Sequence, residues 1–432
     1  MQKKRKKQER DTFKNEVGYA DMVQSKKIKP VIVLIIFYCF LASAGASMTL
    51  GHNPWVDFFA AIICFAFFSS KKAIKVTNGT ATASFLLLIS SMYTIHGGSI
   101  AGYIAYAMEV SLAIVLLNLK HEWRIELLEI LNKWFAVLLV LSIATWFVHL
   151  LIPLPHSSRV VDVFYSANGI TINNYFFFKE TMVVESGVAD FQRFQGMFME
   201  PGHLGTIVAF FLIVNCFDFK KRECIVFLVT ILLSLSAAAY VITALGYALF
   251  KFTESGAKRI IVSALVLLVL VLVASLYNGG DNPINNLVFG KLTREGGLME
   301  SRTSFSVLTM FSNMLGSGGT DLLFGYGANV EGEGSAGFIY FFVCNGIIGC
   351  VLLFAAYHSI YRSCRTRYGL IVFIIYLVSF LQRTYPHWDA FSFPFILGLP
   401  FFLKGKKRNL VRRLVDNNQI TSVTEFTNSN VV

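Results

Sequence analysis

Apolar runs long enough to cross a lipid bilayer recur along most of the chain, from residue 30 to residue 403. A hydrocarbon core about 30 Å thick needs about 20 apolar residues for each helical crossing. The 432 residues are 55% hydrophobic and only 15% charged. In a soluble globular protein about a quarter of the residues are charged, so the composition excludes that class. We therefore predict an all-α polytopic membrane protein, with residues 30–403 as a single membrane domain in the lipid bilayer.

The lengths of these runs predict about twelve transmembrane or membrane-embedded helices. One segment, Cys224–Phe250, is long for one crossing and short for two. The other expected helices are Pro30–Leu50, Pro54–Ser70, Thr80–Ile95, Ser99–Asn118, Trp134–Leu151, His203–Phe217, Ile260–Tyr277, Gly337–Tyr357, Tyr368–Leu381 and Phe391–Phe402.

The net charge of +12 follows the positive-inside rule, because basic residues gather between apolar runs and at both ends of the chain. A nucleic acid is therefore not an expected partner. If Cys224–Phe250 crosses twice, turning near Ser234 and Ser236, about 31 of the 38 basic residues lie in the cytoplasm, against about 23 for one crossing. We therefore predict a hairpin of short helices, whose turn must be buried in protein or line a wet cavity.

This topology places both ends of the chain in the cytoplasm, as a basic tail at 1–29 and a second tail at 404–432. Two long loops, at about 152–202 and 278–336, then face outward, together with a short one at about 382–390. In the second long loop, apolar residues recur at helical spacing over Ser304–Leu315. This spacing predicts a helix that lies on the membrane surface.

A few basic residues lie in the outward-facing loops, contrary to the positive-inside rule, so each needs a reason for its position. Most are arginines, whose planar guanidinium binds phosphate or carboxylate through two parallel hydrogen bonds. Four of these arginines lie near predicted helix ends, where they could bind a lipid pyrophosphate: Arg193, Arg294, Arg302 and Arg383. The alternative for each is an ion pair with a nearby loop acid.

The segment from Arg193 to His203 leads directly into a predicted helix, so Glu200 and His203 would lie at its outer N-terminus. Glu200 could simply cap that helix, where the helix dipole favours an anion. Alternatively, Glu200 or His203 is the base that takes a proton from an attacking hydroxyl group. His387, in the short polar loop, is a weaker candidate for that base. This loop suits either a sugar-binding lip or an interfacial aromatic belt.

Glu109 is the one ionisable side chain near the centre of a predicted helix, where acids are functional by default. A proton or cation transporter could use it, or it could be a protonated or hydrogen-bonded contact between helices. No basic partner is visible in another predicted helix. The glycine-rich stretch around Gly325 and Gly327 could bind phosphate through its backbone amides, although its spacing fits neither a Walker nor a dinucleotide loop.

Three groups of residues form a pattern when taken together. They are Arg193, Gly196, Glu200 and Pro201 before a helix; Arg302 with the amphipathic stretch from Phe305 to Leu315; and Gly325 and Gly327 before a helix with Gly346 and Gly349. The pattern resembles the Wzy-type O-antigen and capsule polymerases, which form a superfamily with the O-antigen ligases. The resemblance covers roughly residues 190–405. Ligases usually have a histidine where this chain has Ser335-Ala336, so the ligase alternative fits less well.

The resemblance implies a multi-pass protein of the bacterial inner membrane. It would transfer a glycan from undecaprenyl pyrophosphate to a sugar hydroxyl of an incoming lipid-linked repeat unit, on the extracytoplasmic face. Its substrate would be an undecaprenyl-pyrophosphate-linked oligosaccharide, and its protein partners a flippase and a chain-length regulator. The resemblance implies pyrophosphate binding by the four outward arginines and a base among Glu200, His203 and His387.

No cofactor is expected. The outer loops contain no Asp-x-Asp, and the cysteines show no metal-type spacing, so no divalent metal is expected either. Besides a ligase, the remaining alternative is a secondary transporter or flippase of lipid-linked sugars. That class predicts internal repeats and paired intramembrane charges, and the sequence shows neither.

Overall fold

The computed structural model describes residues 28–49, 52–161, 170–182, 193–255, 304–327, 330, 337–381 and 387–400. Most of these residues are helical. The helices are α2 (Pro30–Ser43), α3 (Pro54–Ser70), α4 (Asn78–Tyr93), α5 (Ile100–Glu109), α6 (Ser111–Leu117), α7 (His121–Leu151), α8 (Pro201–Val214), α9 (Arg222–Ser234), α10 (Ala237–Ser255), α13 (Phe305–Ser317), α14 (Thr320–Phe324), α15 (Phe338–Ser363), α16 (Arg367–Phe380) and α17 (Asp389–Gly398).

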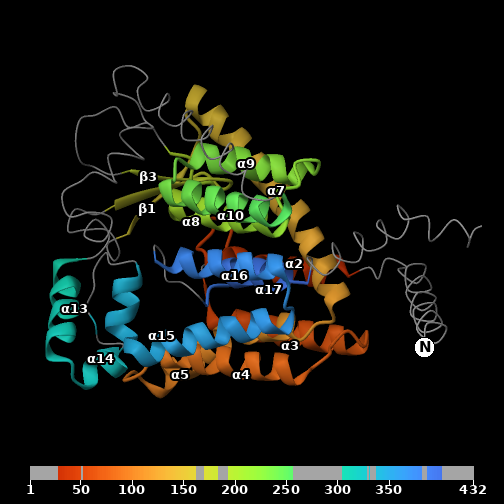
Figure 1. The fold of residues 1–432 in the computed structure, drawn as a ribbon. Coiled ribbons are helices and arrows are strands. Elements are labelled where there is room, and N and C mark those ends of the chain that lie inside the picture. The colour runs from red at the N-terminus through yellow and green to blue at the C-terminus, as the bar shows by residue number, and fades with distance from the viewer. Residues whose placement is uncertain are drawn as a thin grey trace, which may run out of the picture.

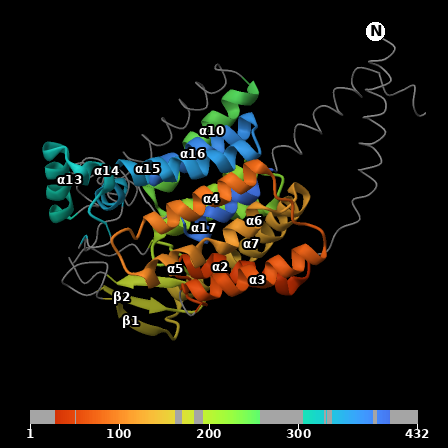
Figure 2. The ribbon, with the colours of Figure 1, turned by 90° about the horizontal axis from the view of Figure 1, so that it is seen from below.

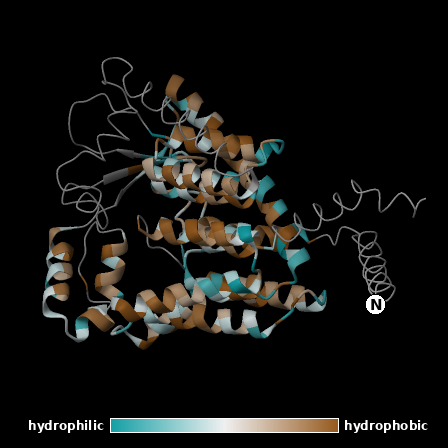
Figure 3. Cartoon of the chain, viewed as in Figure 1, coloured by the Kyte–Doolittle hydropathy of each residue, from teal (hydrophilic) through white to brown (hydrophobic). Residues whose placement is uncertain are grey.

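Within the described ranges, three helical stretches are long and apolar enough to cross a membrane: Ile100–Leu117, His121–Leu151 and Phe338–Ser363. Many of their apolar side chains point outward. On α7, for example, Val137 and Phe147 are both exposed. Figure 3 shows hydrophobic residues along most of the length of the helices. Apolar surface of this extent is unfavourable in water and typical of contact with lipid.

Several predicted helices have the expected bounds, and α3 at Pro54–Ser70 matches its prediction at both ends. The first predicted helix, in contrast, ends at Ser43 and not at Leu50. Gly45 has a φ of +66° there. The N–H of Ala46 donates to the carbonyl of Leu41 at 3.1 Å, and the N–H of Gly45 to Ala42 at 2.9 Å. This pair of hydrogen bonds is the Schellman motif, which ends a helix at a left-handed glycine.

Other predicted helices also differ from the structure. The helix expected to end at Tyr357 continues to Ser363 as α15, and the one expected at Phe391–Phe402 is α17 at Asp389–Gly398. The helix expected at Ser99–Asn118 is divided at Val110 into α5 and α6. The helix expected to begin at Trp134 begins at His121, so α7 has 31 residues and a length of roughly 46 Å. This length exceeds the bilayer core, and the polar first turns of α7 extend beyond the apolar run. The helix predicted at Ile260–Tyr277 lies outside the described residues.

The break predicted within Cys224–Phe250 is confirmed, because the segment forms two helices, α9 and α10. Its double crossing of the membrane stays a prediction. The chain turns at Leu235, which has a φ of +45°. Helix α8 packs closely against this turn, because Gly205 has no side chain. A Cβ at Gly205 would lie 3.0 Å from the Ser234 hydroxyl and 2.7 Å from the Ala239 Cβ.

The prediction of an all-α protein is wrong in one region. The loop expected at 152–202 contains three strands, β1 (Ser157–Val161), β2 (Ile170–Asn174) and β3 (Lys179–Met182). They form an antiparallel sheet in the order β1-β2-β3. These strands are short and polar at many positions, so a search for apolar runs does not detect them.

The sheet lies at one end of the helix bundle, which we call the sheet end (Figure 1). Helix α13 lies at the same end and runs steeply across the direction of α16, as Figures 1 and 2 both show. The helix predicted at Ser304–Leu315 is therefore confirmed as a helix. Its Phe305 and Leu315 side chains are exposed.

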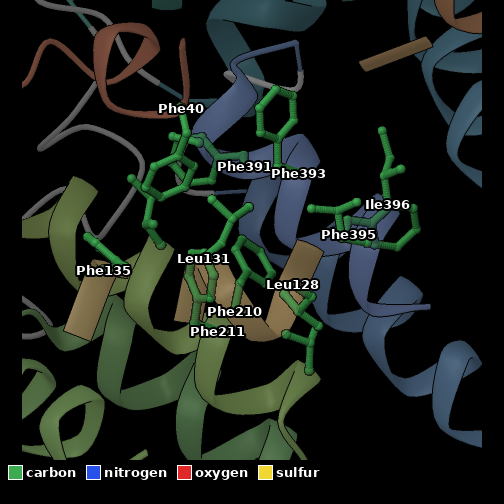
Figure 4. Packing of buried hydrophobic residues seen from close by; sticks show 14 of the residues in the cluster. Phe40, Leu128, Leu131, Phe135, Phe210, Phe211, Phe391, Phe393, Phe395 and Ile396 are labelled. Atoms are coloured by element: carbon green, nitrogen blue, oxygen red, sulfur yellow. The ribbon is translucent and has the colours of Figure 1, made fainter. Parts of the chain in front are cut away.

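Helix α17 lies at the centre of the bundle and contacts α2, α6, α7 and α8. All of its residues are buried. Figure 4 shows aromatic side chains from α2, α7, α8 and α17 packed together around it. The rings of Phe40 and Phe211 are 5.6 Å apart, and those of Phe210 and Phe391 are 6.3 Å apart. These aromatic pairs join helices that are far apart in the sequence.

Polar contacts hold α17 near both ends. Near its first residue, the N–H of Ala390 donates to the Ser43 hydroxyl at 2.9 Å. Near its last residue, the fully buried Arg124 donates from Nε to the carbonyl of Ile396 at 3.1 Å, and its Nη2 donates to the same oxygen. Carbonyl groups at a helix C-terminus lack partners within the helix, so Arg124 supplies one.

Candidate functional site

The start of α8 carries two of the residues predicted to act as a base. Pro201 is the first helical residue, and Glu200 immediately precedes it in an extended conformation. The carbonyl oxygen of Glu200 accepts hydrogen bonds from the N–H groups of His203 and Leu204, at 3.1 and 3.3 Å. The Glu200 side chain does not cap the helix. The structure therefore does not support the interpretation of Glu200 as a side-chain cap.

Arg193 joins the segment before α8 to the hairpin turn. Its Nη2 donates to the carbonyl oxygen of Leu235 at 2.8 Å. Gly196, three residues further on, has a φ of +55°, and a Cβ there would lie 3.3 Å from Leu204 in α8. Arg193, the hairpin turn and the start of α8 are thus packed into one region.

The short polar loop before α17 reaches the same region. The rings of Trp388 and His203 meet edge to face, with centroids 5.4 Å apart. His387, the residue before Trp388, is buried, and neither of its ring nitrogens has a hydrogen-bond partner. Burial lowers the pKa of His387 to about 4, although the charge of Glu109 acts in the opposite direction. His387 is therefore uncharged near neutral pH.

Four of the predicted site residues are thus described: Glu200 and His203 at the start of α8, Arg193 in contact with the hairpin turn that packs against this helix, and His387 beside Trp388, which contacts His203. The edge strand β3 is connected to this region. The N–H of Lys179 in β3 donates to the carbonyl of Gly196 at 2.6 Å. The other three predicted residues, Arg294, Arg302 and Arg383, lie outside the described residues.

Lys179, one of the basic residues expected to face outward, has a structural role. Its Nζ donates to the carbonyl oxygen of Gly45 at 2.6 Å. The N–H of Ser47 donates to the carbonyl of Met197 at 3.0 Å. The first contact fixes β3, and the second fixes the segment before α8, to the turn after α2. Together they place the sheet beside the candidate site.

The glycine-rich stretch is explained by packing. Helix α15 is kinked at Gly346, which has φ 59° and ψ −164°. The stretch around Gly325 lies directly against this kink, and the N–H of Tyr326 donates to the carbonyl of Val343 at 2.9 Å. A Cβ on Gly346 would lie 2.5 Å from the carbonyl oxygen of Leu323. These glycines allow two backbones to touch, which accounts for them without a bound phosphate.

Glu109 has a partner that the sequence did not indicate. It lies at the end of α5, and its Oε1 is 3.4 Å from Nε2 of His52. Nδ1 of the same histidine is 3.6 Å from Oδ2 of Asp57 in α3. Burial alone would lower the pKa of His52, but the hydrogen bond and charge of Glu109 outweigh burial and raise it. His52 was missed because it lies in the loop before α3 and not in a helix.

Two further buried groups adjoin this pair. The sulfur of Cys39 and one carboxylate oxygen each of Asp57 and Asp389 lie within 4.8 Å of one another. We call Cys39, Asp57 and Asp389 the buried cluster. These residues come from α2, α3 and α17, and each is at most 1% exposed. Thiol and carboxylate groups in this arrangement could hold a metal ion.

Comparison with known proteins does not assign this chain to a family. The chain matches no protein-family model, and no curated protein and no solved structure is significantly similar to it.

Proposed function

We propose that this protein polymerises lipid-linked oligosaccharide repeat units into a surface polysaccharide, an O-antigen or a capsule. In this proposal it lies in the bacterial inner membrane with about twelve helices and both tails in the cytoplasm. The sheet end then faces outward. The observation that carries the proposal is that Glu200 and His203 lie at the start of α8, and that Arg193 contacts the hairpin turn packed against this helix.

The proposed reaction replaces one bond to the reducing-end sugar by another. The bond from its anomeric carbon to the pyrophosphate oxygen breaks, and a bond to the hydroxyl oxygen of the acceptor sugar forms. Undecaprenyl pyrophosphate leaves, and Arg193 helps to neutralise its charge, together with Arg294, Arg302 and Arg383. Glu200 takes the proton of the acceptor hydroxyl, with His203 as the next candidate.

Two findings support this assignment of roles. Glu200 directly precedes α8, and its side chain makes no capping hydrogen bond to this helix. The ring of His203 meets Trp388 edge to face, which places the loop that carries His387 beside the same helix start. Helix α13 lies at the same end of the bundle and exposes Phe305 and Leu315, which suits contact with the undecaprenyl chain of the substrate.

The proposal is tested by deleting the gene from its host and analysing the surface glycan. We expect a single repeat unit in place of long chains. Lipid-linked repeat units extracted from the deletion strain are then added to the purified protein in liposomes. A ladder of longer products should form with the natural protein and not with Glu200→Gln. Long chains in the deletion strain would refute the proposal, and free polymer that is not attached to its acceptor would favour a ligase.

A second candidate function is a transporter or flippase of lipid-linked sugars, driven by protons or cations. It is favoured by the ion pair between His52 and Glu109 and by the adjoining Asp57, because transporters use such intramembrane charges. Deletion of a flippase would leave lipid-linked units on the cytoplasmic leaflet and no repeat unit at the surface. The same deletion strain therefore separates the two functions.

A further inference from the structure

The buried cluster has too few partners for the charges it can carry. Among the residues that the structure describes, neither carboxylate oxygen of Asp389 has a hydrogen-bond partner, and Oδ2 of Asp57 has none either. The cation nearest to Asp57 is His52, whose Nδ1 lies 3.6 Å from Oδ2 of Asp57. The other ring nitrogen of His52, Nε2, lies 3.4 Å from Oε1 of Glu109. A buried carboxylate is stable only when it is protonated, paired with a charge or bound to a metal ion. Asp389 therefore requires either a proton or a cation.

The oxygen of Asp389 points into the cluster, because it lies within 4.8 Å of both the Cys39 sulfur and an Asp57 oxygen. The backbone is built to keep it there. Ser43, one turn after Cys39 in α2, accepts a hydrogen bond from the N–H of Ala390. This bond fixes the first turn of α17 against the face of α2 that carries Cys39. Three helices thus present their donor atoms to one point.

The types of donor atom select the kind of ion. Mg²⁺ and Ca²⁺ bind through oxygen and keep six or more ligands, so a thiol is not a suitable donor for either. Zn²⁺ binds sulfur, carboxylate oxygen and imidazole nitrogen together and needs about four ligands. His52, beside Asp57, is placed to orient that carboxylate as histidine and carboxylate partners do around metals.

We propose that Cys39, Asp57 and Asp389 bind one Zn²⁺ ion, or another divalent transition-metal ion of similar chemistry, which ties α2, α3 and α17 together. Binding releases the thiol proton of Cys39 to solvent, because the thiolate is the ligand. The fourth ligand is the second oxygen of one of the two carboxylates or a water molecule. The three residues are almost completely buried, so substrate cannot reach the ion and its role is structural. This inference does not depend on the proposed function.

The test is the metal content of the full-length protein, purified in detergent without chelators and measured by mass spectrometry. We expect about one zinc ion per chain, and less than about a tenth of that in Cys39→Ser and in Asp389→Asn. Cys224→Ser is the matched control. Its thiol is equally buried, but it lies in α9, which contributes nothing to the cluster. The control should keep its zinc.

A second measurement covers variants that fail to fold. The natural protein is stripped with a chelator and reloaded with Co²⁺, which gives a strong near-ultraviolet charge-transfer band only when a thiolate is bound. We expect this band, and we expect the lost thermal stability of the stripped protein to return with Zn²⁺. The proposal is overturned if the natural protein contains no metal and takes up neither ion. In that case protons neutralise the cluster. Metal retained in both Cys39→Ser and Asp389→Asn would also overturn it.

Discussion

Replacing Gly346 by alanine should strongly destabilise the protein, because the kink of α15 has a backbone conformation that only glycine adopts readily. Its φ of 59° and ψ of −164° lie in a region where another residue costs about 1–3 kcal/mol. The new Cβ would also lie 2.5 Å from the backbone oxygen of Leu323. Relieving that overlap costs about 1–3 kcal/mol more. The free energy of unfolding should therefore fall by about 2–6 kcal/mol.

Gly316→Ala is the matched control for this change. Gly316 lies in α13, and a Cβ there would meet no atom within 4 Å. Alanine should stabilise this helix by about 0.5–1 kcal/mol. Both variants are compared with the natural protein by thermal unfolding in the same detergent and by their abundance in membranes. If Gly346→Ala unfolds at the same temperature as the natural protein, the packing argument is wrong. Phosphate binding would then be the better explanation of these glycines.

Four further predictions follow from the same arguments. Glu200→Gln should accumulate normally yet lose about a hundredfold or more in rate, so normal chain lengths would exclude Glu200 as the base. Arg302→Lys keeps the charge but not the paired hydrogen bonds, so polymer formation should fall at unchanged abundance; full activity would assign Arg302 to an ion pair. A reporter at Ser255 should report cytoplasm and one at Asn313 the outside; a cytoplasmic Asn313 would disprove the proposed topology. Arg124→Lys should lower the free energy of unfolding by about 1–3 kcal/mol, measured as a lower melting temperature, because one ammonium group cannot reproduce the guanidinium contacts with Ile396; an unchanged melting temperature would contradict this.

The helices were predicted well where their signals are local. Helix α3 begins after Asn53, whose side chain accepts from the N–H of Trp55 at 3.0 Å, and has Pro54 in its first turn. Both are visible in the sequence as start signals. The hairpin of α9 and α10 was predicted from charge counting alone. The end of α2 at Gly45 was missed because the apolar run continues past the turn.

The candidate site was predicted only in part, because some of its residues are close together in the sequence and others are far apart. Glu200 and His203 belong to one helix start, so a local pattern identifies them. The buried cluster combines residues 39, 57 and 389, and only the packing of α2, α3 and α17 brings them together. The prediction of no metal considered the outer loops and the cysteine spacing. Neither observation can detect a cluster whose residues come one at a time from separate helices, so the prediction of no metal stays a prediction.

Helix α17 connects the stability of this protein to its candidate site. Asp389 begins the helix and belongs to the buried cluster, while Trp388, one residue earlier, touches His203. Any change that shifts the first turn of α17 therefore moves both regions at once. A loss of activity at Asp389 or Trp388 cannot by itself separate catalysis from folding. Glu200 lies outside α17 and does not cap α8, so the chemistry is best tested there.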